Sequence, residues 1–311
     1  MVQGKNLKKY FNTPRGLLHA VDGVDVSINE GKTVGVVGES GCGKSTLGRV
    51  LIRLLEASGG EVFFEGQDIF LFNDQKMLEM RKVMQIIFQD PYSSLNPRMS
   101  VSEIIAEPIK VCKILKTKAE INDRIVELME IVGLAERYIN MYPHELDGGR
   151  RQRIGIARAL AVNPRFIVCD EPVSALDVSI QAQILNLLMD LQDEFKLAYM
   201  FITHDLSVVR HISNQIMVMY LGECVEFASS MELFENPLHP YTKALLDAIP
   251  VPSLAQRGQP RKIIKGEVTS PISPKPGCRF ATRCPNVKKE CSEPVPNKEV
   301  GENHFVKCVL Y

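Results

Sequence analysis

The sequence has no net charge, no long hydrophobic run and no apolar leader. Its 37 Lys and Arg balance 37 Asp and Glu, so composition gives no electrostatic reason to expect a nucleic-acid partner. No apolar stretch reaches the roughly 18 residues that a membrane span requires. The start, MVQGKNLKKYF, lacks the apolar core of a secretory signal. We therefore expect a cytosolic protein that reaches a membrane only through a partner.

The chain contains alternating strand and helix patterns. Its 311 residues are enough for two domains, or for one large domain with an appendage. Short apolar runs predict buried strands, and longer segments with apolar residues at helical spacing predict helices. Strands are expected at 33–38, 166–169 and 198–202, with two more within 216–227 joined at Leu221-Gly222; helices are expected at 45–55, 150–161 and 175–195. This alternation predicts an α/β fold with a mostly parallel sheet.

Two stretches depart from that alternation. Residues 95–145 show a helical pattern without a strong strand, which predicts a helical insert. Prolines crowd the sequence from residue 250, so we interpret 250–276 as a linker and 277–311 as a small separate element.

Residues 38–45, GESGCGKS, match the phosphate-loop pattern G-x-x-x-x-G-K-[ST] between an expected strand and an expected helix. In such a loop, backbone N–H groups curl around a phosphate, a lysine supplies charge to the β- and γ-phosphates, and a hydroxyl binds Mg²⁺. Lys44 and Ser45 are the candidates for the last two roles. The pattern predicts a nucleotide site.

A second candidate is FIVCDE, residues 166–171, where an apolar strand ends in two acids. Asp170 can hold Mg²⁺ through its water shell, and Glu171 can polarise a water for attack on the γ-phosphate. Alone, the pair would be interpreted as an ordinary acidic loop. Beside a phosphate loop, the catalytic interpretation is favoured.

The order of short motifs resembles the ATPase cassette of ABC transporters over roughly residues 1–250. The motifs are GESGCGKST, Gln89 in IIFQDP, LDGGRRQR, FIVCDE, SALD (174–177) and His204 in FITHD. The resemblance implies a P-loop NTPase core with a mostly parallel sheet, an antiparallel β edge and a helical subdomain at about 95–158. It implies ATP and Mg²⁺ as ligands, with ATP held by Gly38, Glu39, Ser40, Gly41, Cys42, Gly43, Lys44, Ser45 and Thr46.

The resemblance also implies roles outside the phosphate loop. Gln89 would join Ser45 and Asp170 at Mg²⁺, sense the attacking water and link to a membrane subunit. His204 would contact the γ-phosphate, and Ala175 to Asp177 would cross a dimer interface. Tyr10 would stack on adenine, although Phe11 is a rival and either ring could belong to the core.

In this family two cassettes sandwich two ATP molecules head to tail, so Asp147, Gly148 and Gly149 would contact ATP held by a partner. The usual signature LSGGQ is LDGGR here. An ionised Asp147 repels phosphate and can only accept hydrogen bonds, unless Arg150 or Arg151 neutralises it. We hypothesise an asymmetric heterodimer in which the site completed by Asp147 works poorly or differently.

Four of the eight cysteines lie in residues 277–311, the C-terminal segment: Cys278, Cys284, Cys291 and Cys308. A segment so short and polar buries little core, and four thiolates could hold a metal centre. The segment lacks the C-x2-C pairs common in zinc sites, and four cysteines also suit an iron–sulfur cluster. Together with NPLHPYTKALLDAIP (236–250), it resembles the C-terminal extension of oligopeptide and dipeptide importer ATPases, some of which carry a 4Fe–4S cluster. We favour that cluster over Zn²⁺, and either over free thiols.

We therefore predict an ATPase domain at 1–250 and a C-terminal extension at 251–311. The expected function is to energise import of di- and oligopeptides from the cytoplasmic face of the membrane. The expected partners are a second ATPase subunit, two transmembrane permease subunits contacted around Gln89 and 91–107, and indirectly an extracytoplasmic peptide-binding protein. The alternatives are an importer of nickel or another small solute, and a soluble ABC ATPase acting on DNA or ribosomes, which the neutral charge and single cassette disfavour.

Overall fold

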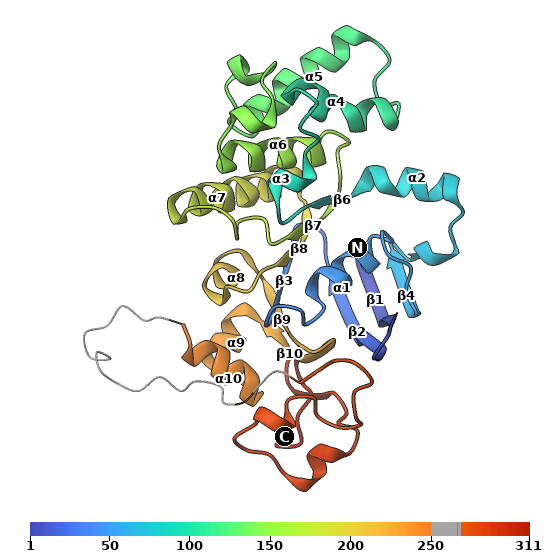
Figure 1. Ribbon diagram of the computed structural model, residues 1–311, viewed down its shortest axis with the longest axis vertical. Coiled ribbons are helices and arrows are strands. Elements are labelled where there is room, and N and C mark those ends of the chain that lie inside the picture. The colour runs from blue at the N-terminus through green and yellow to red at the C-terminus, as the bar shows by residue number, and fades with distance from the viewer. Residues whose placement is uncertain (250–265, 267–268) are drawn as a thin grey trace, which may run out of the picture. The chain divides into compact units, whose positions relative to one another are not determined.

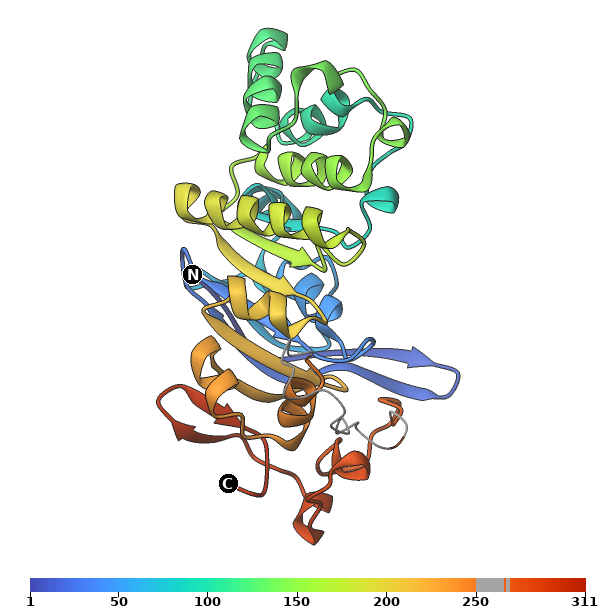
Figure 2. The same ribbon diagram turned by 90° about the vertical axis from the view of Figure 1, so that its left-hand side faces the viewer.

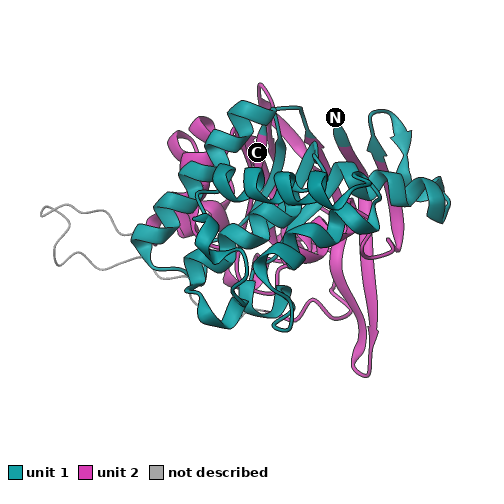
Figure 3. Cartoon of the chain, turned by 90° about the horizontal axis from the view of Figure 1, so that it is seen from above, with its two compact units in different colours: residues 1–2, 28–32, 63–202 teal, residues 3–27, 33–62, 203–311 magenta. Residues whose placement is uncertain are grey.

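The computed structural model describes residues 1–249, 266 and 269–311, and the chain divides into two compact units (Figure 3). Unit 1 comprises residues 1–2, 28–32 and 63–202. Unit 2 comprises residues 3–27, 33–62 and 203–311. Because the chain passes repeatedly from one unit to the other, sequence neighbours around residues 32, 62 and 202 belong to different units.

The sheet of unit 1 consists of three parallel strands in the order β6-β7-β8. They are β6 (Met84–Ile87), β7 (Phe166–Asp170) and β8 (Ala198–Ile202). Every residue of β7 and β8 is buried, as expected for parallel strands covered on both faces. The strands predicted at 166–169 and 198–202 are thus confirmed.

The other large elements of unit 1 are helices. After α2 (Asp74–Val83) and β6 come α3 (Pro91–Ser94), α4 (Val101–Val111), α5 (Lys118–Ile131), α6 (Gly148–Leu160) and α7 (Val178–Phe195). Figure 1 shows α4, α5 and α6 gathered at one end of this unit. Ser100 and Thr117 begin α4 and α5 with capping boxes, which satisfy backbone N–H groups that a helix start leaves unpaired. The stretch 95–145 is described throughout and contains no strand, so the helical insert is confirmed.

The main sheet of unit 2 mixes parallel and antiparallel pairs. β3 (Thr33–Val37) lies parallel to β9 (Gln215–Tyr220), and β9 pairs antiparallel with β10 (Glu223–Ser229). β9 and β10 form the hairpin predicted at Leu221-Gly222. The described part of this unit also contains the helices α1 (Lys44–Leu51), α8 (Leu206–Ile212), α9 (Ser230–Glu235) and α10 (Pro240–Asp247).

A long N-terminal hairpin, which the sequence patterns did not indicate, also belongs largely to unit 2. It is formed by β1 (Val2–Thr13) and β2 (Gly16–Ile28), and it appears as the extended blue ribbons of Figure 2. β4 (Gly59–Phe64) is the next strand, giving the order β2-β1-β4, and the end of β4 pairs with the short β5 (Gln67–Asp68). In this hairpin buried and exposed residues alternate strictly over 24–28 (VDVSI), a strand signal that the sequence patterns above overlooked, and the alternation is lost over 7–20.

Two predicted helices are shorter than expected. α1 ends at Leu51 rather than at 55, because Arg53 takes a left-handed conformation (φ 52°) and a residue in that conformation ends a helix. α7 begins at Val178 rather than at 175, with Asp177 at its N-cap position.

The C-terminal segment is part of unit 2 rather than a separate element. β12 (His304–Val306) pairs antiparallel with β10, and β11 (Lys298–Gly301) pairs with β12. His304 Nε2 lies 2.9 Å from Glu226 Oε1, and both side chains are buried. Most of the linker predicted at 250–276 lies outside the described residues. Strand pairing between distant segments leaves no local signature, so the sequence could not show this attachment.

Phe280 is the main apolar anchor of the segment. Its ring is 1% exposed and lies 5.3 Å from the rings of both Tyr220 and Tyr241. We expect Phe280→Ala to lower the free energy of unfolding by about 3–5 kcal/mol, the usual cost of deleting a buried aromatic side chain.

Denaturant unfolding of the purified chain measures this loss. Val287→Ala is the matched control, because Val287 belongs to the same segment and is 55% exposed. Equal unfolding midpoints for Phe280→Ala and the unmutated chain would contradict the anchoring role.

Candidate functional site

The phosphate loop of unit 2 connects β3 to α1. Gly43, the residue before the helix, has φ 104°, and a Cβ atom there would lie 1.9 Å from the carbonyl oxygen of Ala20. Both the left-handed backbone and the close approach exclude any side chain. The loop thus follows a path that only this glycine pattern permits, and it places Ser45 and Thr46 in the first turn of α1.

Lys44 is 5% exposed and folds over the loop. Its Nζ donates hydrogen bonds to the carbonyl oxygens of Gly38 (2.8 Å) and Glu39 (3.0 Å). Cys42 is also buried, and burial raises the pKa of its thiol, so it remains neutral. The loop therefore presents one fixed ammonium group beside the N-terminus of a helix, a combination that suits a phosphate anion.

Glu39 ties the loop to the C-terminal part of unit 2. Its backbone N–H donates to Tyr241 Oη at 2.9 Å, and its carboxylate accepts two hydrogen bonds from the Arg283 guanidinium. Sequence reasoning missed Tyr241 and Arg283. Tyr241 lies within 236–250 and Arg283 lies among the C-terminal cysteines, two stretches that resemble importer ATPases, but neither stretch carries a local signal that points to the phosphate loop.

Tyr10 lies in β1 and is half-buried. Its hydroxyl donates to Asp22 at 2.5 Å, and its ring centroid is 4.2 Å from that of His19. Burial, together with the Asp22 carboxylate, raises the pKa of Tyr10 to about 12. Phe11, its rival for the adenine role, instead has the Lys9 ammonium 4.9 Å from its ring centre.

In unit 1, Asp170 ends β7 and is 1% exposed. Glu171 follows with φ 46°, a left-handed conformation that is uncommon for a non-glycine residue and is found most often at functional sites. Gln89, after β6, donates from Nε2 to Glu171 Oε2 at 3.0 Å. The structure thus brings together two predicted site residues that lie far apart in sequence.

Asp147 is the N-cap of α6. Its carboxylate accepts from the backbone N–H of Arg150 at 2.8 Å and forms an ion pair with the Arg150 guanidinium. Gly148 and Gly149 begin the helix, and a Cβ at Gly149 would lie 2.7 Å from Ile180. Arg151 lies over the Tyr92 ring instead. Serine and aspartate are equally good N-caps, so Asp147 preserves the helix start of the usual signature. Its counter-ion is Arg150 of the same helix.

The remaining predicted residues are also located. Leu176 lies next to Gly148, 3.2 Å from where a Cβ there would be, which places the SALD segment beside the glycine pair in unit 1. His204 follows β8, is exposed and belongs to unit 2.

The structure gives no support to the metal centre expected at the four C-terminal cysteines. All are free thiols, with Cys291 and Cys308 buried and the other two half-buried. Burial raises the pKa of Cys278 to about 11 and raises that of Cys284 as well, and neighbouring cysteines of the group add to both shifts. Among the residues that the structure describes, no group of three or more His, Cys, Asp or Glu is arranged to hold a metal ion.

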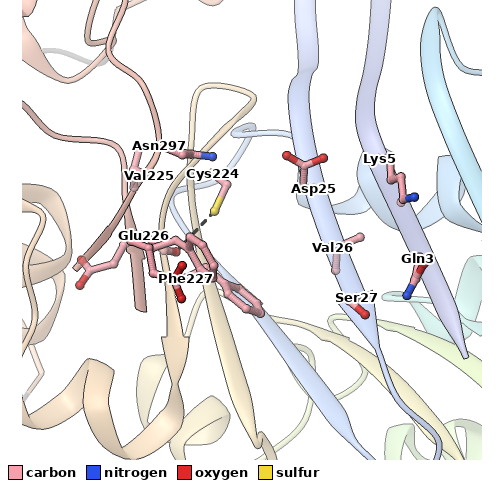
Figure 4. Close-up of a pocket in the computed structure, with 13 residues that line it drawn as sticks. Gln3, Lys5, Asp25, Val26, Ser27, Cys224, Val225, Glu226, Phe227 and Asn297 are labelled. Carbon is pink, nitrogen blue, oxygen red and sulfur yellow. Dashed lines mark hydrogen bonds between the residues drawn. The ribbon is translucent and has the colours of Figure 1, made fainter. Parts of the chain in front are cut away.

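Sequence reasoning also missed a cavity of about 810 Å³ in unit 2 (Figure 4). It lies between the N-terminal hairpin and β10, and none of the predicted site residues lines it. Its one thiol, Cys224, donates to the carbonyl oxygen of Glu226, and burial raises the pKa of this thiol to about 12. This thiol is therefore not a reactive nucleophile. The lining also includes Lys5, Asp25, Ser27, Phe227, Asn297 and Glu299.

The phosphate loop and the acid pair after β7 place the chain among P-loop nucleotide-binding proteins. Comparison with known proteins narrows this class. The family model described as ABC transporter matches residues 21–174. A second model, described as oligopeptide/dipeptide transporter, C-terminal region, matches residues 225–291.

Individual relatives agree with these matches. The oligopeptide transport ATP-binding protein AppF of Bacillus subtilis is 50% identical over 99% of this chain and 96% of its own length. OppF of Salmonella typhimurium is 50% identical over 98% of this chain and 92% of its own. The dimeric ATP-binding cassette MJ0796, solved with ADP and Pi, is 30% identical with a TM-score of 0.68, covering 74% of this chain and 99% of that one. The chain belongs to the ABC transporter family and is an ABC-type ATPase.

Tyr241, which contacts the phosphate loop, depends in turn on His239, the N-cap of α10. His239 Nδ1 accepts from the Tyr241 N–H, and burial lowers the pKa of His239 to about 4. In the unfolded chain the pKa is near 6.5. Between pH 6.5 and 4 only the unfolded state takes up this proton, so protonation favours unfolding in that range and not above it. The free energy of unfolding therefore decreases by about 1.4 kcal/mol per pH unit as the pH falls from 6.5 toward 4.

Measuring the free energy of unfolding between pH 7 and pH 4.5 tests this. His239→Asn keeps an N-cap acceptor without a titrating group. Its free energy of unfolding should therefore fall by about 1.4 kcal/mol less per pH unit than that of the unmutated chain. Identical slopes for the two proteins would show that His239 is not the titrating group.

Proposed function

We propose that this chain is the ATP-hydrolysing subunit that energises an oligopeptide importer. The observation that carries the proposal is the match of residues 225–291 to the C-terminal region of oligopeptide/dipeptide transporters. Relatives that align with nearly the whole chain are named oligopeptide transport ATP-binding proteins. These names favour peptide cargo over nickel, and over action on DNA or ribosomes.

The residues present suit Mg-ATP. Lys44 neutralises charge on the β- and γ-phosphates, and the loop from Gly38 to Thr46 supplies backbone donors. The Ser45 hydroxyl and the Asp170 carboxylate are oxygen ligands of the kind Mg²⁺ prefers. Bound there, Mg²⁺ would neutralise charge that develops on the phosphates.

Glu171 is the proposed general base. Its carboxylate would accept the proton of the attacking water, and Gln89, which already donates to that carboxylate, would orient it and ligate Mg²⁺. His204 would contact the γ-phosphate. Tyr10 would stack on the adenine ring.

The cassette is proposed to work as a dimer with a second, different ATPase subunit bound to two permease subunits. The cassette MJ0796 was solved as a dimer with ADP and Pi, which supports pairing of cassettes. In the pair, Asp147, Gly148 and Gly149 would contact ATP on the partner, and residues 91–107 with Gln89 would contact a permease. No helix among the described residues is long and apolar enough to cross a membrane. In this proposal the permease subunits hold the chain at the cytoplasmic face, and an extracytoplasmic protein supplies the peptide.

A metal centre at the four cysteines is not part of the proposal. As the described residues are arranged, their thiols do not form a metal-binding group. Neither a 4Fe–4S cluster nor Zn²⁺ therefore contributes a step to the mechanism above.

Glu171→Gln should abolish most ATP hydrolysis while leaving ATP binding intact. Loss of a general base costs on the order of 10² to 10⁴ in kcat. ATPase assays and equilibrium nucleotide binding on the assembled transporter measure the two effects. Glu130→Gln is the matched control, because Glu130 is an exposed acid of the same unit. A Glu171→Gln transporter with normal turnover would contradict the assignment.

Asp147→Ser should raise ATP turnover of the assembled transporter, because in the proposed asymmetric dimer the site completed by Asp147 is the weaker of the two. Serine keeps the helix cap and removes the negative charge facing the partner's ATP. A twofold rise is expected, because a second site would become active. Unchanged turnover, or two equivalent active sites in a dimer of this chain alone, would contradict the asymmetry.

A further inference from the structure

We propose that Arg283 and Arg279 of the C-terminal segment are positioning residues of the nucleotide site, which hold the phosphate loop and the adenine-side tyrosine in place. This inference rests on the proposed function, because it assumes that the loop binds ATP. It assigns a role to a segment that lies outside the ATPase motifs and that the cysteines do not explain.

The contact of Arg283 with the phosphate loop is specific. Its Nη1 lies 2.8 Å and its Nη2 3.0 Å from the two carboxylate oxygens of Glu39. This two-pronged pairing is the strongest geometry available to an arginine and a carboxylate. The Arg283 side chain is 7% exposed and that of Glu39 26%, so solvent screens the pair only in part.

The pair matters because Glu39 is an acid within a loop that receives an anion. An uncompensated carboxylate there would repel a triphosphate, and at this degree of burial the repulsion would be only partly screened. Arg283 neutralises the acid. It also fixes the carboxylate in one direction, so that the loop retains a single shape.

Arg283 is itself held firmly. Its Nη1 also donates to Tyr220 Oη at 3.3 Å. Tyr220 lies 4.8 Å from Tyr241, whose hydroxyl accepts from the backbone N–H of Glu39. Phe280 packs against both tyrosines. The same aromatic cluster thus holds both the side chain of Glu39, through Arg283, and its backbone N–H, through Tyr241.

Arg279 extends the same segment to the other predicted contact with ATP. Its side chain is 6% exposed, donates to the carbonyl oxygen of Leu221 and forms an ion pair with Asp22. Asp22 also accepts the hydrogen bond that the Tyr10 hydroxyl donates. One stretch of seven residues, CRFATRC from Cys278 to Cys284, therefore fixes both the phosphate loop and the tyrosine proposed to stack on adenine.

The decisive measurement is the dependence of ATPase rate on Mg-ATP concentration for the assembled transporter. We expect Arg283→Gln to raise the KM for ATP about tenfold and to change kcat by less than about twofold, the pattern for lost binding that ground and transition states share. Lys289→Gln is the matched control. It belongs to the same segment, is exposed, and has no side-chain partner among the described residues, so its KM should stay that of the unmutated protein.

A second substitution separates positioning from general support of the fold. In Glu39→Gln the loop carries no acid, so adding Arg283→Gln should change the KM by less than about twofold. If Arg283→Gln raises the KM equally in both backgrounds, its role is only structural and the proposal fails. If Arg283→Gln does not fold, Arg283→Lys replaces it in the test, because lysine keeps the charge but not the two-pronged pairing. Arg283→Lys should raise the KM for ATP by less than about tenfold, and an unchanged KM in this variant refutes the proposal.

The outcomes also distinguish this inference from the proposed function. A transporter that neither binds nor hydrolyses Mg-ATP would overturn both. A transporter that hydrolyses ATP normally and keeps its KM in Arg283→Gln would overturn the positioning role alone.

Discussion

The structure of unit 2 depends on one steric constraint, the narrow passage of the phosphate loop past two backbone carbonyl groups. A Cβ at Gly38 would lie 2.2 Å from the carbonyl oxygen of Met219 in β9, and one at Gly43 would lie 1.9 Å from that of Ala20 in β2. The loop can curl there only because both residues are glycines with left-handed backbones. Neighbouring groups then fix it, since Gly222 N–H donates to Cys42 O and Tyr241 Oη accepts from Glu39 N–H.

Features with a local chemical signature were predictable from sequence. The buried strands β3, β7 and β8 are unbroken apolar runs, and the hairpin of β9 and β10 turns at Leu221-Gly222. The phosphate loop has a pattern that almost no other structure requires. For the same reason the order of short motifs was sufficient to indicate the family, which the comparisons confirm.

What could not be predicted depends on contacts between distant residues. Glu39 and Arg283 are 244 residues apart, and Asp22 and Arg279 are 257 apart. Nothing in the sequence near either arginine indicates its partner. The cysteine spacing likewise did not indicate the contacts that hold the segment, which include the buried Phe280 and the pairing of β12 with β10. Of the two arginines that the sequence offered as counter-ions of Asp147, the structure shows that Arg150 forms the ion pair, and that Asp147 also caps α6.

The pairing of β12 with β10 has a consequence for any shortened form of the protein. A chain cut after α10 would keep every ATPase motif, yet it would lose β11 and β12 and leave one edge of β10 with unpaired backbone groups. Such an open edge recruits strands from other molecules and leads to aggregation. In the intact chain the outermost strand is β11, which is short, fully exposed and carries Lys298 and Glu299. The C-terminal segment thus extends the sheet and covers the edge of β10, at which strands of other molecules could otherwise pair.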